Sequence, residues 1–331
     1  ASKAWIEIFN RLDAHLRGTH PGTRLLGPCL ASGTFFSWGG WQDWTVPVLE
    51  GAASPLTHFN YHCYDEGAYT QLAWQEMLQA RADALGRPRP MAVVTEMNYG
   101  LDKGAPEENR RRVRWWAQQL FTALQNPDKA AGYHYFLAAF RKFSESNLFQ
   151  QQDGRWAPND PYWLYRTLAD LRGRLVYVEP VADPRVRVAA ASPAPDRIVA
   201  AVFNDADSPR EVVLQPAGPL ANEMEKTAAR IRFARYDDAD GPIVHGEETA
   251  VPEDGALRAV LAPGEVRTVH WTLARPIEPS ATLRRRTFYS PVTGQAFDES
   301  LRVPIAVPRL PSDRETAWLR LGIYGDDLLR A

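Results

Sequence analysis

The sequence predicts an α/β part followed by an all-β part. Up to about residue 174, short apolar runs alternate with longer segments of helical periodicity, which is typical of a parallel sheet with helical crossovers. From about residue 175, apolar and polar residues alternate in many short runs, which is typical of a β-sandwich region. Nine of the 11 tryptophans precede residue 175, so a surface suited to stacking is expected in the first part.

The first part contains four strand–helix units. Apolar residues at helical spacing, such as Trp5, Phe9 and Leu12, predict a first helix. The predicted helices cover residues 3–17, 68–85, 107–125 and 161–171, and the predicted strands cover residues 24–31, 56–64, 91–97 and 133–140. Four such units make half of a (β/α)₈ barrel. A nucleotide-binding sheet is the weaker alternative, because no Gly-rich phosphate loop follows any strand.

The second part is predicted to be a β-sandwich region over residues 175–331, with room for two small sandwiches. Its alternating runs cover residues 185–188, 197–203, 211–214, 230–233, 266–271, 283–289 and 317–321. Clusters of Pro, Gly and Asp separate these runs. The boundary between the two parts is expected near residues 172–177.

Charge and composition exclude several function classes. The 38 Lys and Arg residues against 40 Asp and Glu give a net charge of −2, which argues against a nucleic-acid partner. No run approaches the ~18 apolar residues of a membrane span, and no signal peptide is visible. Cys29 and Cys63 are expected to be packed thiols rather than a disulfide pair. The histidines show no metal-ligand spacing, so no metal site is expected.

Three polar residues at strand ends are candidates for catalysis. Glu96 ends an apolar strand, where a carboxylate is costly unless it is paired or functional. Active sites of (β/α)₈ barrels lie at the carboxyl ends of the strands, which favours a catalytic role, whereas the bland alternative is an ion pair with a neighbouring Arg or Lys. His62 and Tyr64 share one side of the preceding strand, and they are suited to bind a carboxylate or sugar hydroxyls.

Aromatic residues are the candidates for sugar stacking. Trp38, Trp41 and Trp44 follow the first strand, and Gly39-Gly40 between them favours an irregular loop. A single helical turn that buries its core face is the alternative, since the tryptophans are three residues apart. Tyr135 lies in the fourth strand, where its ring either lines a pocket or fills the core.

Short motifs in both parts resemble those of clan A glycoside hydrolases. In the first part they are Gly27-Pro28, His62-x-Tyr64-Asp65 and Thr95-Glu96. In the second part, Asp183-Pro184, Ala201-Val-Phe-Asn204, Thr287-Phe-Tyr289 and the segment 317–322 resemble strands of glycoside hydrolase family 86, the β-agarases and β-porphyranases. The resemblance implies strands five to eight of the barrel in residues 1–174.

The resemblance also implies an activity, namely retaining hydrolysis of a galactan such as agarose or porphyran. Glu96 is then the nucleophile, positioned by His62 and Tyr64, and no cofactor is required. Trp38, Trp41, Trp44, Asn98 and Tyr135 then bind the sugar. The acid/base Glu of clan A ends strand four, and no counterpart is present upstream, so the amino-terminal half of the barrel is expected as a missing partner. A secreted or periplasmic location is also implied.

Two alternatives stay open from the sequence. One is another clan A specificity, such as that of a xylosidase or a mannanase. The other is a non-catalytic carbohydrate-binding protein, because the expected acid/base Glu is absent from these residues.

Overall fold

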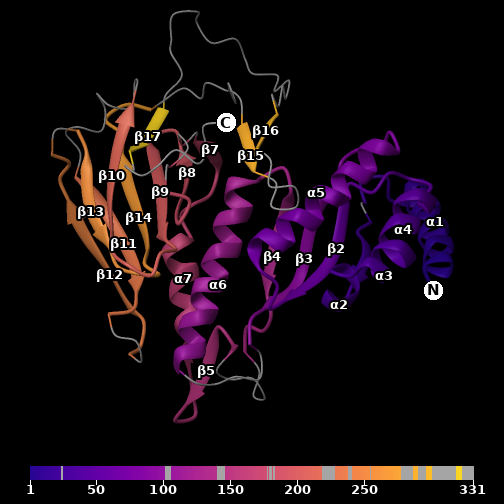
Figure 1. The fold of residues 1–331 in the computed structure, drawn as a ribbon, viewed down its shortest axis with the longest axis horizontal. Helices are drawn as coiled ribbons and strands as arrows, with labels where there is room; N and C mark the ends of the chain where they lie inside the picture. Colours follow the sequence, from indigo (N-terminus) through magenta and orange to yellow (C-terminus); the bar gives the residue numbers. More distant parts are fainter. Residues whose placement is uncertain are drawn as a thin grey trace, which may run out of the picture. The chain divides into compact units, whose positions relative to one another are not determined.

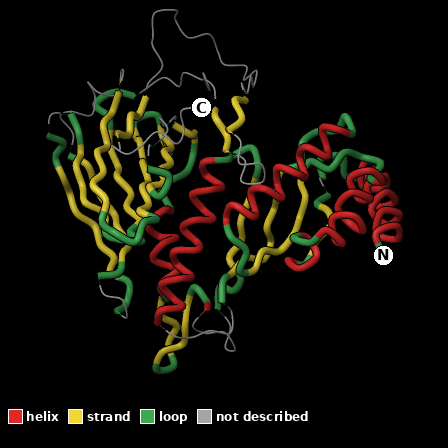
Figure 2. The backbone as a smooth tube through the Cα atoms, in the orientation of Figure 1, coloured by secondary structure: helices red, strands yellow, loops and turns green. Residues whose placement is uncertain are grey.

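The computed structural model describes residues 1–23, 25–100, 106–139, 146–176, 178, 181, 183–217, 228–237, 241–253, 255–276, 286–289, 296–299 and 318–322. The chain forms two compact units (Figure 1). The first comprises residues 1–104 and 122–155, and the second comprises residues 105–121 and 156–331. Helices alternate with strands in the first unit, whereas strands predominate in the second (Figure 2).

The first unit is built on a four-stranded parallel sheet in the order β1-β2-β3-β4. Its strands are β1 (Gly27–Leu30), β2 (His58–Tyr64), β3 (Met91–Asn98) and β4 (Ala130–Tyr135). The sequence prediction of four parallel strands is confirmed. β1 is shorter than predicted, and β4 begins three residues earlier than predicted.

The helices of the first unit include α1 (Ser2–Thr19) and α5 (Ala68–Ala84), both as predicted. The segment between β1 and β2 was expected to be an irregular loop, and this prediction is wrong. It forms α2 (Ser32–Phe35), α3 (Trp38–Gly40), a π-helical turn η1 (Trp41–Thr45) and α4 (Val46–Gly51). The Ser37 hydroxyl caps α3 by accepting a hydrogen bond from Gly40 N. Glycine is required at position 40, because an added Cβ would lie 1.7 Å from the carbonyl oxygen of Thr34.

The side chains of strand β2 alternate between a buried and a partly buried face of the sheet. Phe59, Tyr61 and Cys63 are fully buried, whereas the residues that alternate with them are only partly buried. The Phe35 ring of α2 stacks on Tyr61 with centroids 3.8 Å apart. Gln75 of α5 donates to the Tyr61 hydroxyl at 2.6 Å and to the Tyr133 hydroxyl of β4 at 3.1 Å. The alternate residues of β2 are therefore free to form a polar site on the opposite face.

The second unit contains most of helix α6 (Pro106–Gln125) and all of α7 (Asp160–Leu168). A six-stranded antiparallel sheet has the order β12-β11-β14-β9-β8-β7, and a three-stranded one has the order β13-β10-β17. Their bounds are β7 (Arg174–Val176), β8 (Val186–Ala194), β9 (Arg197–Asn204), β10 (Arg210–Ala217), β11 (Ala229–Arg235), β12 (Val244–Ala250), β13 (Leu257–Leu261), β14 (Val266–Thr272) and β17 (Trp318–Gly322). Two small sheets pair β5 (Phe149–Gln152) with β6 (Arg155–Pro158), and β15 (Arg286–Tyr289) with β16 (Ala296–Glu299).

One hydrophobic core joins the two larger antiparallel sheets. Val188, Val202 and Trp271 of the six-stranded sheet cluster with Leu214 and Leu257 of the three-stranded sheet. The predicted period-two strands are confirmed where the structure describes them, whereas much of the predicted second sandwich lies outside the described residues. The domain boundary near residue 174 stays a prediction. The division of the chain into two compact units places residues 105–121 and 156–174 in the second unit.

Replacement of Gln75 by Leu should destabilise the first unit by about 2–4 kcal/mol. The substitution keeps the volume of the side chain but leaves the buried hydroxyl of Tyr61 and the hydroxyl of the partly buried Tyr133 without this donor. Urea unfolding followed by tryptophan fluorescence measures the loss. Gln42→Leu is the matched control, because Gln42 is exposed and its replacement should change stability by less than about 0.5 kcal/mol. Equal stability of the two variants would contradict the assigned role of Gln75.

Candidate active site

Glu96 lies near the carboxyl end of β3 and contacts two side chains of β2. The Tyr64 hydroxyl donates a hydrogen bond of 2.7 Å to Glu96 Oε2. His62 Nδ1 lies 3.2 Å from the same oxygen. The Glu96 side chain is 36% exposed and that of His62 is 20% exposed, so the group borders solvent. Among the described residues, the partners of this carboxylate are therefore an imidazole and a phenol rather than an Arg or Lys.

A register shift between β2 and β3 accounts for this arrangement. Tyr61 pairs with Val94, but the next residue, His62, pairs with Glu96, so Thr95 is an extra residue in β3. Strict alternation would place Thr95 and Glu96 on opposite faces. Instead, the Thr95 hydroxyl donates at 2.8 Å to Asn60 Oδ1, and Asn60 shares its face of β2 with His62. The extra residue therefore brings two polar side chains of β3 to the face that carries His62.

Cys29 extends the group to β1, and the sequence analysis did not include it in the site. Its sulfur lies 3.0 Å from His62 Nε2 and 3.7 Å from Thr95 Oγ1. Cys63 is a buried thiol, as expected, but Cys29 is exposed, so the expectation of a packed thiol is wrong for Cys29. Its neighbours in β1 are buried, and the alternation of the strand turns Cys29 to the other face. No motif in the sequence identifies Cys29 or Asn60 as members of this group.

Tyr64 acts as a hydrogen donor to Glu96. Burial is the main reason why the pKa of Tyr64 is raised far above its usual value, and the hydrogen bond to Glu96 raises it further. The phenol therefore stays protonated at neutral pH and donates its hydrogen to Glu96 Oε2. Asp65, directly after Tyr64, accepts a hydrogen bond from Gly100 N at 2.7 Å and so ties the end of β2 to the segment after β3.

The side chains of Asn98 and Tyr135 form hydrogen bonds with backbone groups. The Asn98 side chain is fully buried and donates to the carbonyls of Phe136 and Ser146, while its Oδ1 accepts from Tyr99 N at 2.8 Å. The Tyr135 hydroxyl donates to the Ser146 carbonyl at 2.7 Å. These bonds join the end of β3 to the segment that follows β4. Contact of either residue with a sugar stays a prediction.

Two of the three predicted tryptophans lie against a fourth one, Trp74. Trp38 is 64% exposed, and its ring lies 5.7 Å from that of Trp74 on α5. Trp41 is partly buried and lies 5.8 Å from the same ring. Trp44 is also partly buried. Among the described residues, the rings of Trp38 and Trp41 contact Trp74 rather than Glu96. Trp38 offers the most accessible ring of the three predicted tryptophans.

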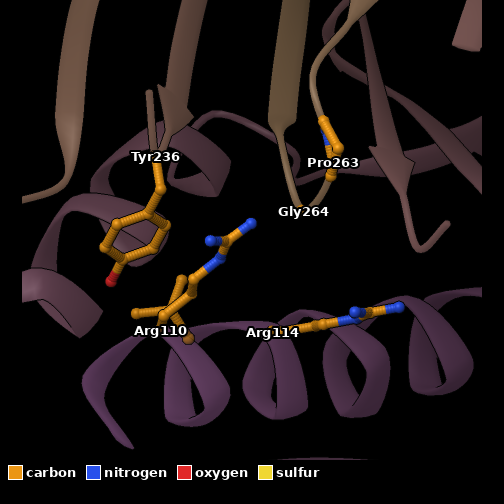
Figure 3. A pocket seen from close by; sticks show the side chains of 6 residues that line it. Arg110, Arg114, Tyr236, Pro263 and Gly264 are labelled. Carbon is orange, nitrogen blue, oxygen red and sulfur yellow. The ribbon is translucent and has the colours of Figure 1, made fainter. Parts of the chain in front are cut away.

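A small pocket in the second unit has different chemistry (Figure 3). It is lined by Arg110, Val113, Arg114, Tyr236, Pro263 and Gly264. Arg114 is occupied by ion pairs with Asp205 at 3.0 Å and Asp207 at 2.6 Å. The buried Tyr236 hydroxyl donates to Asp160 at 2.7 Å. No carboxylate is among the lining residues, so this pocket lacks the group that the first site presents.

In the described part of the chain, no group of three or more His, Cys, Asp or Glu residues is arranged to hold a metal ion. No helix among the described residues is both long and apolar enough to cross a membrane.

Comparison with solved structures places this fold among those of glycoside hydrolases. BuGH86 in complex with neoagarooctaose matches with a TM-score of 0.68 and 15% identity, over 87% of this chain and 50% of that one. BpGH86A, a β-porphyranase of glycoside hydrolase family 86 from the human gut bacterium Bacteroides plebeius, matches with a TM-score of 0.65 and 14% identity, over 87% and 54% of the two chains.

A monomeric β-xylosidase from Caulobacter crescentus CB15 is also similar, with a TM-score of 0.56 and 12% identity over 83% of this chain and 66% of that one. The chain spans about half the length of the family 86 structures. No family model and no curated protein matches the sequence. At these identities the comparisons establish the fold, which resembles that of family 86.

Replacement of Tyr64 by Phe should reduce the loss of stability in alkali. A Tyr pKa raised in the folded state contributes stability that is complete below the unfolded value of about 10 and is lost as the pH rises toward the folded value. Tyr64→Phe removes one such group. Urea unfolding at about pH 8 and about pH 11 should therefore show a smaller difference in the variant than in the wild type. Tyr69→Phe, at an exposed position, should leave the difference unchanged, and an effect as large as that of Tyr64→Phe would argue against the assignment.

Proposed function

We propose that the chain is part of a retaining glycoside hydrolase in which Glu96 is the nucleophile. The observation that carries this proposal is the carboxylate near the end of a parallel strand, bound on one oxygen by Tyr64 and His62. These two contacts fix the orientation of the carboxylate. A nucleophile in glycoside hydrolysis must be oriented toward the anomeric carbon.

The two oxygens of Glu96 have different environments. Tyr64 and His62 both contact Oε2, and among the described residues no hydrogen bond reaches Oε1. In the proposed reaction Oε1 attacks the anomeric carbon as the glycosidic C–O bond breaks, and a glycosyl ester forms. A second carboxyl group gives its proton to the leaving oxygen and then activates the water that hydrolyses the ester.

The proposed architecture is strands five to eight of a (β/α)₈ barrel, followed by a β-sandwich region. The four-stranded parallel sheet and the similarity to about half of the family 86 chains support this interpretation. In this proposal β1–β4 are strands five to eight, and the acid/base carboxylate belongs to strands one to four of the barrel. The proposed partner of this chain is therefore the amino-terminal half of the barrel.

The proposed substrate is a galactan such as agarose or porphyran. The similarity to a structure with bound neoagarooctaose and to a β-porphyranase supports this class. The likeness to a β-xylosidase keeps a xylosidase or mannanase as the first alternative, and a non-catalytic carbohydrate-binding protein is the second. A secreted or periplasmic location belongs to the same proposal, because polymeric galactans lie outside the cell. The proposed reaction needs no cofactor and no nucleic-acid or membrane partner.

Replacement of Glu96 by Gln should abolish hydrolysis of agarose or porphyran oligosaccharides by a protein that also contains strands one to four. Loss of a nucleophile typically lowers kcat by about 10⁴-fold or more. Binding of the oligosaccharides should change little, because the amide has the same shape. Product release measured by reducing-sugar assay and binding measured by calorimetry separate the two effects.

The matched control is Glu50→Gln. Glu50 is an exposed carboxylate at the end of α4 that pairs with Arg81, so its replacement should keep wild-type turnover. Near wild-type turnover of the Glu96→Gln variant would remove Glu96 from the mechanism. If neither protein turns over a galactan but both bind one, the carbohydrate-binding alternative is favoured.

Replacement of Trp38 by Ala should weaken oligosaccharide binding by about 1–3 kcal/mol, on the scale of base–aromatic stacking. Trp38 is 64% exposed, so the melting temperature should change little. Trp41→Ala should weaken binding less and lower the melting temperature more, because Trp41 is partly buried. Calorimetric titration with agaro-oligosaccharides tests both. Trp156→Ala is the control, since Trp156 is 50% exposed in the second unit and has no predicted role in binding.

A further inference from the structure

Cys29, His62 and Glu96 form a continuous chain of contacts from β1 to β3. The sulfur of Cys29 lies 3.0 Å from His62 Nε2, and His62 Nδ1 lies 3.2 Å from Glu96 Oε2. A carboxylate oxygen beside Nδ1 favours the hydrogen on that nitrogen, which leaves Nε2 of the neutral ring to accept a hydrogen from the thiol. Cys29, His62 and Glu96 are thus arranged as nucleophile, base and orienting carboxylate, as in catalytic triads.

We propose that Cys29 is a nucleophilic thiol deprotonated by His62, and that it is a covalent modification site for small uncharged carbon electrophiles. With iodoacetamide as the probe, the sulfur attacks the methylene carbon, the S–C bond forms and the C–I bond breaks. Iodide leaves, and the thiol proton passes to His62 Nε2 and then to solvent. Glu96 acts through His62, which it orients, and it is therefore a positioning residue in this reaction.

Among the described residues, the contacts of the sulfur leave His62 as its base. Thr95 is the other polar neighbour that the described part of the chain gives to Cys29, and its hydroxyl hydrogen is donated to Asn60 Oδ1 at 2.8 Å. Thr95 has no basic group of its own. Cys29 is exposed, so an electrophile reaches the sulfur without displacing a packed side chain.

Cys63 provides an internal comparison within the same protein. Cys29 and Cys63 are the two cysteines of the sequence. Cys63 is fully buried on the opposite face of the sheet, and burial raises the pKa of its thiol far above the usual value. In the folded protein Cys63 should therefore be almost unreactive, and its protection reports that the first unit is folded.

The proposal stands independently of glycoside hydrolysis, because its readout is alkylation of a thiol. The experiment treats this chain with iodoacetamide at about neutral pH and measures the labelling of the two cysteine peptides by mass spectrometry over time. Cys29 of the native protein should react at least about tenfold faster than the same residue in the chain unfolded in urea. Cys63 should stay unlabelled in the native protein.

Two histidine variants separate the base from general effects of substitution. His62→Asn should slow the labelling of Cys29 by at least about tenfold while Cys63 stays protected. His58→Asn is the matched control, because His58 lies in the same strand and contacts Thr57 instead. In the His58→Asn variant, the labelling rate of Cys29 should stay within about twofold of the wild-type rate. Glu96→Gln should slow the reaction as well, since the amide no longer favours the hydrogen on Nδ1.

Two results would overturn the proposal. The first is that Cys29 of the native protein reacts no faster than Cys29 of the unfolded wild-type chain. This comparison needs no variant, so it is decisive even if His62→Asn fails to fold. The other is an unchanged rate in His62→Asn with Cys63 still protected. Loss of protection of Cys63 would identify an unfolded variant, and the comparison within the wild-type protein would then decide.

Discussion

The candidate site depends on one extra residue in β3. In two neighbouring parallel strands with a regular register, paired residues point to the same face, and each face receives every second side chain of both strands. Between Tyr61 and His62 the register shifts by one residue, so that Thr95 has no paired residue in the β2 register although its hydroxyl binds Asn60. As a result, Glu96 reaches the face that carries His62 and Tyr64. Without the shift, either Thr95 or Glu96 would point toward the helices, where burial of a carboxylate is costly.

The same shift makes the site a network rather than a single pair. Thr95 binds Asn60, Glu96 binds Tyr64 and His62, and His62 in turn contacts Cys29. Three strands thus contribute polar side chains to one surface. The opposite face of β2 is fully buried, which gives the strand a fixed register, because a slip by one residue would expose Phe59 and Tyr61 and bury His62. Hydrophobic packing on one face therefore fixes the chemistry of the other.

Much of this arrangement was predictable from period-two and helical patterns. The four parallel strands, the helices at Ser2–Thr19 and Ala68–Ala84, and the common face of His62 and Tyr64 all follow from such patterns. The extra residue at Thr95 was not predictable, because a register shift arises between two strands and neither strand shows it alone. For the same reason Cys29 was missed, since its contact with His62 depends on how β1 pairs with β2.

The segment between β1 and β2 shows a second limit of local patterns. Gly39-Gly40 indicated a loop, yet Gly40 is needed because the helical chain passes close to Thr34. Strand β12 was missed because glutamates, glycine and histidine interrupt its apolar pattern, and its place in the sheet comes from pairing with β11. In both cases a tertiary contact, rather than the propensity of the segment, determines the structure.

Gln75 has a consequence for the shape of the surface on which Glu96 lies. Its amide reaches the hydroxyls of Tyr61 in β2 and of Tyr133 in β4, the two strands that flank β3. One side chain therefore sets the spacing between strands that do not pair with each other. A shorter residue at this position would remove this link between the strands on either side of β3, and with it one constraint on where β3 holds Glu96. The helix layer thus acts on the position of Glu96 from the opposite face of the sheet, although none of its residues touches Glu96 in the described contacts.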